Sequence, residues 1–401
     1  MANGPRIGIV LGGTAPAMTL MSGAMLAFDE RNVEFDVIST TGVGGLIGML
    51  YLAPKGGKRK EALLELPNLF VSDWLYRLVP VNFKVFYKYG PFATKFYELR
   101  KALPKFTIAP DDPNPLKRFV NDWMELWATA LTPPGYEVAS KGFMSHVPLV
   151  DDLVDFGKLR ALKTATPKRM FYLNAFSLWK RRLQIFDNDT VNTDVYNAAQ
   201  AMFMLFPPVR LAGDLLTTGA TRDPTGLQAI WTHERDLDAV LALDPVNDCA
   251  WREPANAYDA FQLMLLNPVA ALQQLMFTWY ASWDAAVSAA GSGARAQFRI
   301  PPLYRIPVTI DDSYYPTMLE WTHANALKLQ KIGYDAAAAI AGAMKPFDLR
   351  ALESYRFANF LKAQARPAQF LMMFKPTFEQ AARVMDASVG GARPESGKEA
   401  R

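Results

Sequence analysis

The chain has 401 residues, of which 50% are hydrophobic and 20% charged, so it is long enough to bury a large core. Its net charge of +4 is spread along the sequence, which argues against a nucleic-acid-binding protein. The single cysteine, Cys249, excludes an internal disulfide, and the three histidines lie too far apart in sequence for a metal site, so we expect no metal and no cofactor.

The first residues repeat a strand–loop–helix pattern. Residues 6–11 (RIGIVL) are a short apolar run, a glycine-rich loop covers residues 12–17, and Met18, Met21, Met25 and Phe28 then recur at helical spacing. A second strand ends near Thr41 and leads into an apolar helix over residues 44–53. This close repetition predicts an α/β fold with a mainly parallel central sheet.

The rest of the chain divides by composition. Residues 169–178 and 238–246 are predicted strands, and residues 194–205 a helix. We expect an α/β domain over residues 1–255 that carries an aromatic-rich insertion at about residues 68–140. A mostly helical C-terminal region over residues 256–387 is expected to pack on this domain, and the Gly- and charge-rich tail 388–401 to be disordered.

Residues 36–50 (DVISTTGVGGLIGML) have the pattern of a catalytic turn. In the G-x-S-x-G elbow, a sharp corner between a strand and a helix exposes a nucleophilic serine. Here Gly42 stands at the serine's place. The glycine-rich loop before it lacks the spacing of a phosphate cradle, so it is either an oxyanion loop or a tight strand–helix connection.

Together, these two loops resemble the bacterial patatin-like phospholipases. That family has a strand, a G-G-G-x-[RK]-G loop and, about twenty-five residues later, a G-T-S-x-G elbow. Residues 146–159, 172–188, 198–209, 213–224 and 329–339 also resemble family segments in the same order. The resemblance covers roughly residues 6–345 and implies a three-layer patatin-like fold.

The resemblance implies a Ser–Asp dyad in which the aspartate is the base and the glycine-rich loop holds the oxyanion. The serine position is Gly42, and the aspartate of the family's D-G-[GA] turn is replaced by Thr218. Neither residue can supply the required chemistry. The corresponding segments are the former oxyanion loop (Gly12, Gly13, Thr14 and Ala15), the elbow (Thr40, Thr41, Val43 and Gly44) and the former D-G-A turn (Gly219, Ala220 and Asp223).

Nearby residues offer one alternative dyad. Thr41 and Asp223 flank the two degenerate positions and could act as a relocated nucleophile and base. We favour a structural role, in which Asp223 hydrogen-bonds its own turn, because an elbow aims one position only.

The insertion contains a basic, aromatic segment. Pro91 could open a helix with an apolar stripe and a basic rim, formed by Phe92, Phe96, Leu99, Leu103, Lys95 and Lys101. Such a helix suits a cap over the sheet, a membrane interface or a partner surface.

We therefore expect a patatin-like pseudoenzyme of lipid metabolism. It would act as a subunit or regulator of a homo- or hetero-oligomer, for instance with an active patatin-like homologue, or bind acyl lipids in the former active-site cleft. The alternatives are an active lipid acyl hydrolase or acyltransferase with a relocated nucleophile, and a peripheral membrane scaffold. With neither a signal peptide nor about 18 consecutive apolar residues in the sequence, we expect a cytoplasmic protein, with peripheral contact at the inner membrane as an option.

Overall fold

A computed structural model describes residues 5–13, 18–70, 72–74, 149–203, 206–243, 252–254, 257–289, 300–306, 320–344 and 347–357, with isolated positions such as His146 and Tyr314. Its strands are β1 (Ile7–Leu11), β2 (Val37–Thr41), β3 (Met170–Ser177), β4 (Arg182–Asp187), β5 (Val209–Leu211), β6 (Asp214–Thr218), β7 (Ala239–Leu243) and β8 (Leu303–Ile306). Its α-helices are α1 (Met18–Glu30), α2 (Gly44–Leu52), α3 (Arg59–Leu64), α7 (Leu149–Leu153), α8 (Phe156–Ala161), α9 (Thr193–Gln200), α10 (Leu227–His233), α11 (Ala257–Ala289), α14 (His323–Met344) and α15 (Leu349–Leu352).

The eight strands form one mixed sheet. Strands β3, β2, β1, β7 and β8 lie side by side and run parallel, and β4, β5 and β6 add antiparallel pairs at one end. The α/β fold with a mainly parallel sheet is thus confirmed. Strand β8 comes from the region that the sequence indicated to be mostly helical, and it extends the sheet beyond β7.

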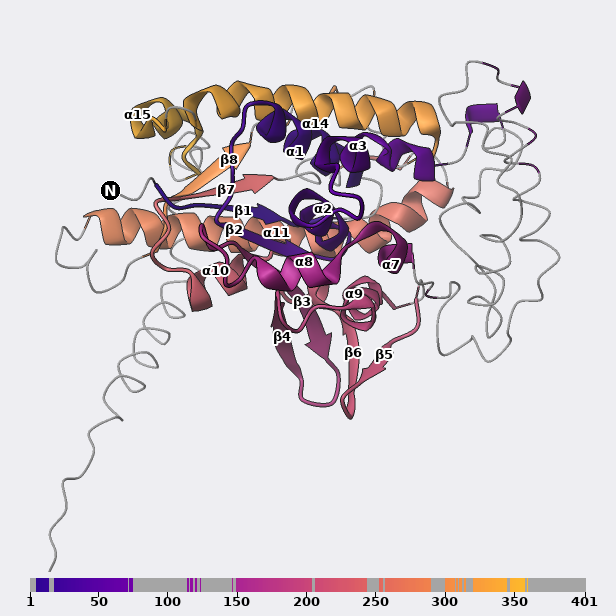
Figure 1. Cartoon of the computed structure of the whole chain (residues 1–401), viewed down its shortest axis with the longest axis horizontal. Coiled ribbons are helices and arrows are strands. Elements are labelled where there is room, and N and C mark those ends of the chain that lie inside the picture. Colours follow the sequence, from indigo (N-terminus) through magenta and orange to yellow (C-terminus); the bar gives the residue numbers. More distant parts are fainter. Residues whose placement is uncertain are drawn as a thin grey trace, which may run out of the picture.

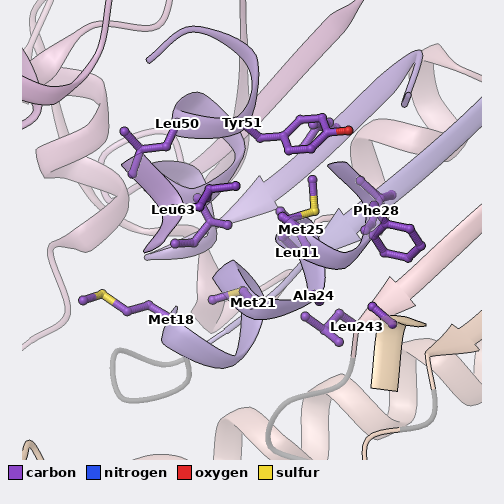
Figure 2. Packing of buried hydrophobic residues seen from close by; sticks show 14 of the residues in the cluster. Leu11, Met18, Met21, Ala24, Met25, Phe28, Leu50, Tyr51, Leu63 and Leu243 are labelled. Carbon is purple, nitrogen blue, oxygen red and sulfur yellow. The ribbon is translucent and has the colours of Figure 1, made fainter. Parts of the chain in front are cut away.

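Helices cover both faces of the sheet, which gives three layers. Alternate side chains of the strands point to opposite faces, so Ile9 and Leu11 of β1 pack with α1 and α2, whereas Val10 packs with α10 and α11. Figure 1 shows α14 lying along α1 on the first face. In Figure 2, side chains from β1, α1, α2, α3 and β7 meet in one cluster that includes Leu11, Met25 and Leu63.

The two long helices of the first face are in unusually close contact. A Cβ added at Gly23 of α1 would lie 1.8 Å from the backbone oxygen of Gln330, and one at Gly333 of α14 would lie 1.8 Å from the backbone oxygen of Leu20. Each glycine therefore lets the backbone of the other helix approach. This reciprocal contact holds α14 against the N-terminal α/β unit.

Strand β3 is shared by three neighbours, and their registers fix which edge each one occupies. Residues 172–174 of β3 pair with both β2 and β4, so those two strands lie on opposite edges. Residues 175–177 pair with both β4 and β6, so β6 lies on the same edge as β2. Because β2 runs parallel to β3 and β6 antiparallel, the carboxyl ends of β2 and β6 point toward each other.

One predicted helix is shorter than expected. The sequence pattern continued to residue 205, but α9 ends at Gln200. The backbone oxygen of Ala201 instead accepts hydrogen bonds from the backbone N–H of Thr218, at 3.1 Å, and from the hydroxyl of Thr217. Pairing with β6 therefore replaces helical hydrogen bonding after this residue.

Candidate functional site at the β2–α2 corner

The corner between β2 and α2 has the backbone of an elbow. Gly42 follows the last residue of β2 with a φ of +54°, in the left-handed region, and α2 begins at Gly44. Among the residues that the structure describes, a Cβ added at Gly42 would meet one atom within contact range, the backbone oxygen of Gly13 at 3.2 Å. At Gly44 the added Cβ would lie 2.0 Å from the backbone oxygen of Leu11. The described residues therefore leave room for a side chain at position 42 and none at position 44.

The loop after β1 lies against this corner. Gly13 is the neighbour of Gly42, and a Cβ at Gly12 would lie 2.2 Å from the backbone oxygen of Pro224. Gly12 thus allows the segment before α10 to pack directly on the end of β1. The sequence placed Gly12, Gly13 and Gly42 in one site, and the structure brings them together.

The end of β6 reaches the same point from the opposite direction. Thr41 pairs with Asn174 of β3, and Thr218 pairs with the next residue, Ala175. Consecutive residues of a strand are about 3.4 Å apart along its axis, so the end of β2 at Thr41 and the end of β6 at Thr218 nearly meet. Gly42 and Thr218, which are far apart in sequence and which the resemblance aligns with the family's dyad, therefore share one corner.

Thr218 and its turn are held by local hydrogen bonds. The Thr218 hydroxyl accepts from the backbone N–H of Ala220 at 3.2 Å, and a short 3-10 turn spans Gly219–Thr221. A Cβ at Gly219 would lie 2.1 Å from Oδ1 of Asn174, so only glycine fits there. The hydroxyl of Thr218 caps this turn, as expected for a residue of that type.

Asn174 is a buried bridge that sequence reasoning missed. Its Oδ1 accepts a hydrogen bond from the Thr41 hydroxyl at 2.6 Å, and its Nδ2 donates to the backbone oxygen of Asp223 at 2.9 Å. It thereby ties the elbow to the turn before α10. The signal was present as one amide in the otherwise apolar run of β3, since a buried amide is hydrogen-bonded in nearly all proteins.

Asp223 is fully buried, and its carboxylate is occupied by its own turn. Oδ1 accepts from the backbone N–H groups of Thr225 and Gly226 and from the Thr225 hydroxyl, and Oδ2 accepts from the N–H of Gln228. Burial raises the pKa of the Asp223 carboxyl, although these donors act in the opposite direction. The structure agrees with the expectation that Asp223 stabilises the turn.

The hydroxyl groups near the corner are also committed. Those of Ser39 and Thr40 donate to the backbone oxygens of Gly226 and Tyr172, at 2.6 and 2.8 Å, and that of Thr41 donates to Asn174. Val43 packs into the core on the α2 side. No carboxylate accepts a hydrogen bond from these three hydroxyls among the described residues.

Several predicted site residues lie outside the described part of the chain. They are Thr14 and Ala15 of the glycine-rich loop and the insertion residues Phe92, Phe96, Leu99, Leu103, Lys95 and Lys101. Within the described ranges, no group of three or more His, Cys, Asp or Glu side chains could hold a metal ion. No helix in those ranges combines the length and apolar character needed to cross a bilayer.

Comparison with known proteins assigns the chain that contains this corner to a family. The sequence model of the patatin-like phospholipases matches residues 9–231, more than half of the 401-residue chain. The chain belongs to the patatin-like phospholipase family. The matched range of this patatin-like protein contains the last three residues of β1, strands β2–β6, the elbow and the turn after Thr218.

Other comparisons find more distant likenesses. Among solved structures, the patatin-like chain is similar to VipD from Legionella pneumophila, with 14% sequence identity and a TM-score of 0.36, over 88% of this chain and 68% of VipD. A likeness at that level adds nothing to the family assignment. No curated protein sequence matches the chain significantly.

Proposed function

We propose that this chain is a non-catalytic member of the patatin-like family. In this proposal Gly42 occupies the nucleophile position and Thr218 the position of the base. The chain then serves as a subunit or regulator of an assembly, or binds acyl lipids at the former catalytic corner.

The observation that carries the proposal is the geometry of position 42. The corner keeps the left-handed backbone of an elbow, and the described residues leave space at position 42, yet Gly42 supplies no side chain to fill it. At the facing end of β6, Thr218 has a hydroxyl that caps its own turn. A threonine hydroxyl is not a base near neutral pH, so a Ser–Asp type of acyl transfer lacks both of its reacting groups.

A relocated dyad of Thr41 and Asp223 is less well supported. The Thr41 hydroxyl donates to the Asn174 amide, which is a poor proton acceptor. The Asp223 carboxylate accepts four hydrogen bonds from residues 225–228. Freeing either group for catalysis would leave buried polar partners unpaired, at about 1–3 kcal/mol for each.

The first experiment measures reactivity of the unmodified protein. Purified full-length chain is incubated with p-nitrophenyl esters and phospholipid vesicles, and separately with a fluorophosphonate probe that labels activated serines. We expect no turnover above background and no labelling. Labelling at any Ser or Thr would refute the proposal and favour the relocated nucleophile.

The second experiment restores the missing groups. Gly42→Ser alone should remain inactive because no base is available, whereas Gly42→Ser with Thr218→Asp should show trace esterase activity. Gly42→Ala with Thr218→Asp is the matched control, since it carries the same backbone strain without a nucleophile. Substantial hydrolysis by Gly42→Ser alone would mean that the corner already contains a base.

The role in an assembly has its own test. A fold that persists without catalysis must be kept for another use, and interfaces favour the aromatic and Met residues in which this sequence is rich. Light scattering of the complex purified from its own organism should report a species larger than one chain. A monomer at micromolar concentration with no co-purifying protein would leave acyl-lipid binding as the remaining role.

A further inference from the structure

Two β-hairpins place a cluster of basic residues and one tryptophan on the surface. The β3–β4 turn carries Trp179, Lys180 and Arg181, β4 begins at Arg182, and the nearby strand β5 carries Arg210. These five residues, called here the hairpin tip, are all exposed, and Trp179 is 53% exposed. Figure 1 shows the β3–β4 and β5–β6 hairpins projecting together from the lower part of the molecule.

Contacts between the hairpins make the tip one surface. The Arg210 guanidinium lies over the Trp179 ring, 5.6 Å from its centroid. At the base of the tip, Asp214 of β6 accepts hydrogen bonds from Ser177 of β3 and Gln184 of β4. The tip is therefore held by both hairpins.

The charge of the tip is almost uncompensated. Asp214 is the acidic residue beside it, and its buried side chain forms an ion pair with Lys180 at 3.1 Å. Burial alone would raise the pKa of Asp214, but hydrogen bonds from Ser177 and Lys180 hold it below its usual value, so this carboxylate stays ionised. Arg181 and Arg182 form no ion pair with any described residue. At least two guanidinium groups thus face solvent beside an exposed indole.

The tip lies at the same end of the sheet as the elbow. Asn174 pairs with the last residue of β2, and β3 continues for three more residues to Ser177 before the turn that carries the tip. Three residues of strand span about 10 Å. A surface bound by the tip would therefore lie next to the corner that contains Gly42.

We propose that the hairpin tip docks this chain on an anionic lipid surface. Arginine and lysine are attracted by the negative charge of anionic headgroups, and tryptophan prefers the level of those headgroups. A single exposed indole does not form the series of stacking platforms expected for single-stranded nucleic acid. The proposal does not depend on whether the corner is catalytic, because it uses none of the residues of the corner.

Co-sedimentation of the full-length chain with vesicles tests the proposal. Vesicles of phosphatidylcholine with about 30 mol% phosphatidylglycerol are compared with vesicles of pure phosphatidylcholine. The salt concentration is about 0.1 M, at which the Debye length is roughly 10 Å. The wild-type chain should bind the anionic vesicles more tightly. Each cation close to the surface contributes about fivefold in partitioning, so Arg181→Gln with Arg182→Gln should weaken binding by about 25-fold.

A control pair removes the same charge at the other end of β3. Arg160 and Lys168 are exposed, and Lys168 lies two residues before β3 begins. Arg160→Gln with Lys168→Gln should leave vesicle binding within about twofold, since both positions lie more than a Debye length from the tip. Trp179→Ala should weaken binding to both kinds of vesicle, because the interfacial preference of tryptophan does not require anionic lipid.

Four outcomes would overturn the proposal. The first is that the wild type does not bind anionic vesicles, and the second is that the tip pair and the control pair lose vesicle binding equally. The third is that Lys95→Gln with Lys101→Gln loses vesicle binding while the tip pair binds normally. The fourth is that a poly(U) oligonucleotide is retained through the tip although vesicles are not bound. The third would assign membrane contact to the insertion, and the fourth would assign the tip to nucleic acid. Ester hydrolysis is not a readout here, so failure of this test leaves the non-catalytic proposal unaffected.

Discussion

The two glycines of the elbow should respond very differently to the same added methyl group. Position 42 requires a left-handed backbone, which costs an L-residue about 1–2 kcal/mol. Within the described part of the chain, the close contact of an added Cβ is the Gly13 oxygen at 3.2 Å. We therefore expect Gly42→Ala to fold normally and to lose about 1–2 kcal/mol of unfolding free energy.

At Gly44→Ala, the backbone preference favours alanine but the packing opposes it. In a helix, alanine is favoured over glycine by about 1 kcal/mol, so propensity alone predicts stabilisation. However, the new Cβ would lie 2.0 Å from the Leu11 backbone oxygen, which is fixed in β1 and cannot rotate away. Helix and strand would have to separate by more than 1 Å, and overpacking of this kind costs about 3 kcal/mol or more.

Gly45→Ala provides an intermediate control. Its added Cβ would lie 2.9 Å from a terminal methyl of Leu173, a side chain that can shift. Urea unfolding followed by circular dichroism should therefore show the largest loss of unfolding free energy for Gly44→Ala, an intermediate loss for Gly45→Ala and the smallest loss for Gly42→Ala. A Gly44→Ala protein as stable as wild type, or a Gly42→Ala protein that cannot fold, would refute the claim that the corner admits a side chain at position 42 and not at position 44.

Two further predictions concern buried polar groups. Asn174→Ala should lower the free energy of unfolding by about 2–4 kcal/mol because it leaves the Thr41 hydroxyl and the Asp223 carbonyl unpaired. In urea unfolding, the double variant with Thr41→Val should lose less than the sum of the two single losses. Full additivity would contradict the bridge. Burial lowers the pKa of His146 from its ordinary value of 6.5, so the unfolded chain binds a proton that the folded chain does not, and stability should fall as the pH drops below about 6.5. His146→Phe keeps a ring to stack on Phe206 and should flatten this dependence between about pH 7.5 and 5.5; an unchanged slope would exclude His146 as its source.

Local sequence patterns were sufficient for the elements around the corner. The apolar run before Gly12 and the helical spacing from Met18 to Phe28 correspond to β1 and α1 because a buried strand and a buried helix face each impose their own period. The paired glycines after Thr41 indicated an elbow because few other residues permit a left-handed turn and so close an approach of helix to strand. The absence of a serine at position 42 was likewise visible in the sequence.

The sequence by itself therefore determined β1, α1, β2 and α2 around the elbow, and the residues Gly42 and Thr218 at the two positions that the family resemblance aligns with its dyad. Only the tertiary structure decided that β2 and β6 share one edge of β3, which brings Thr41 and Thr218 together. It also decided that Asn174 links the Thr41 hydroxyl to the Asp223 backbone oxygen, and that Trp179 and Arg210 form one tip. The physical reason is that periodicity reports which side of an element is buried, whereas strand register and contacts between hairpins depend on residues distant in sequence that meet only when the whole sheet is assembled.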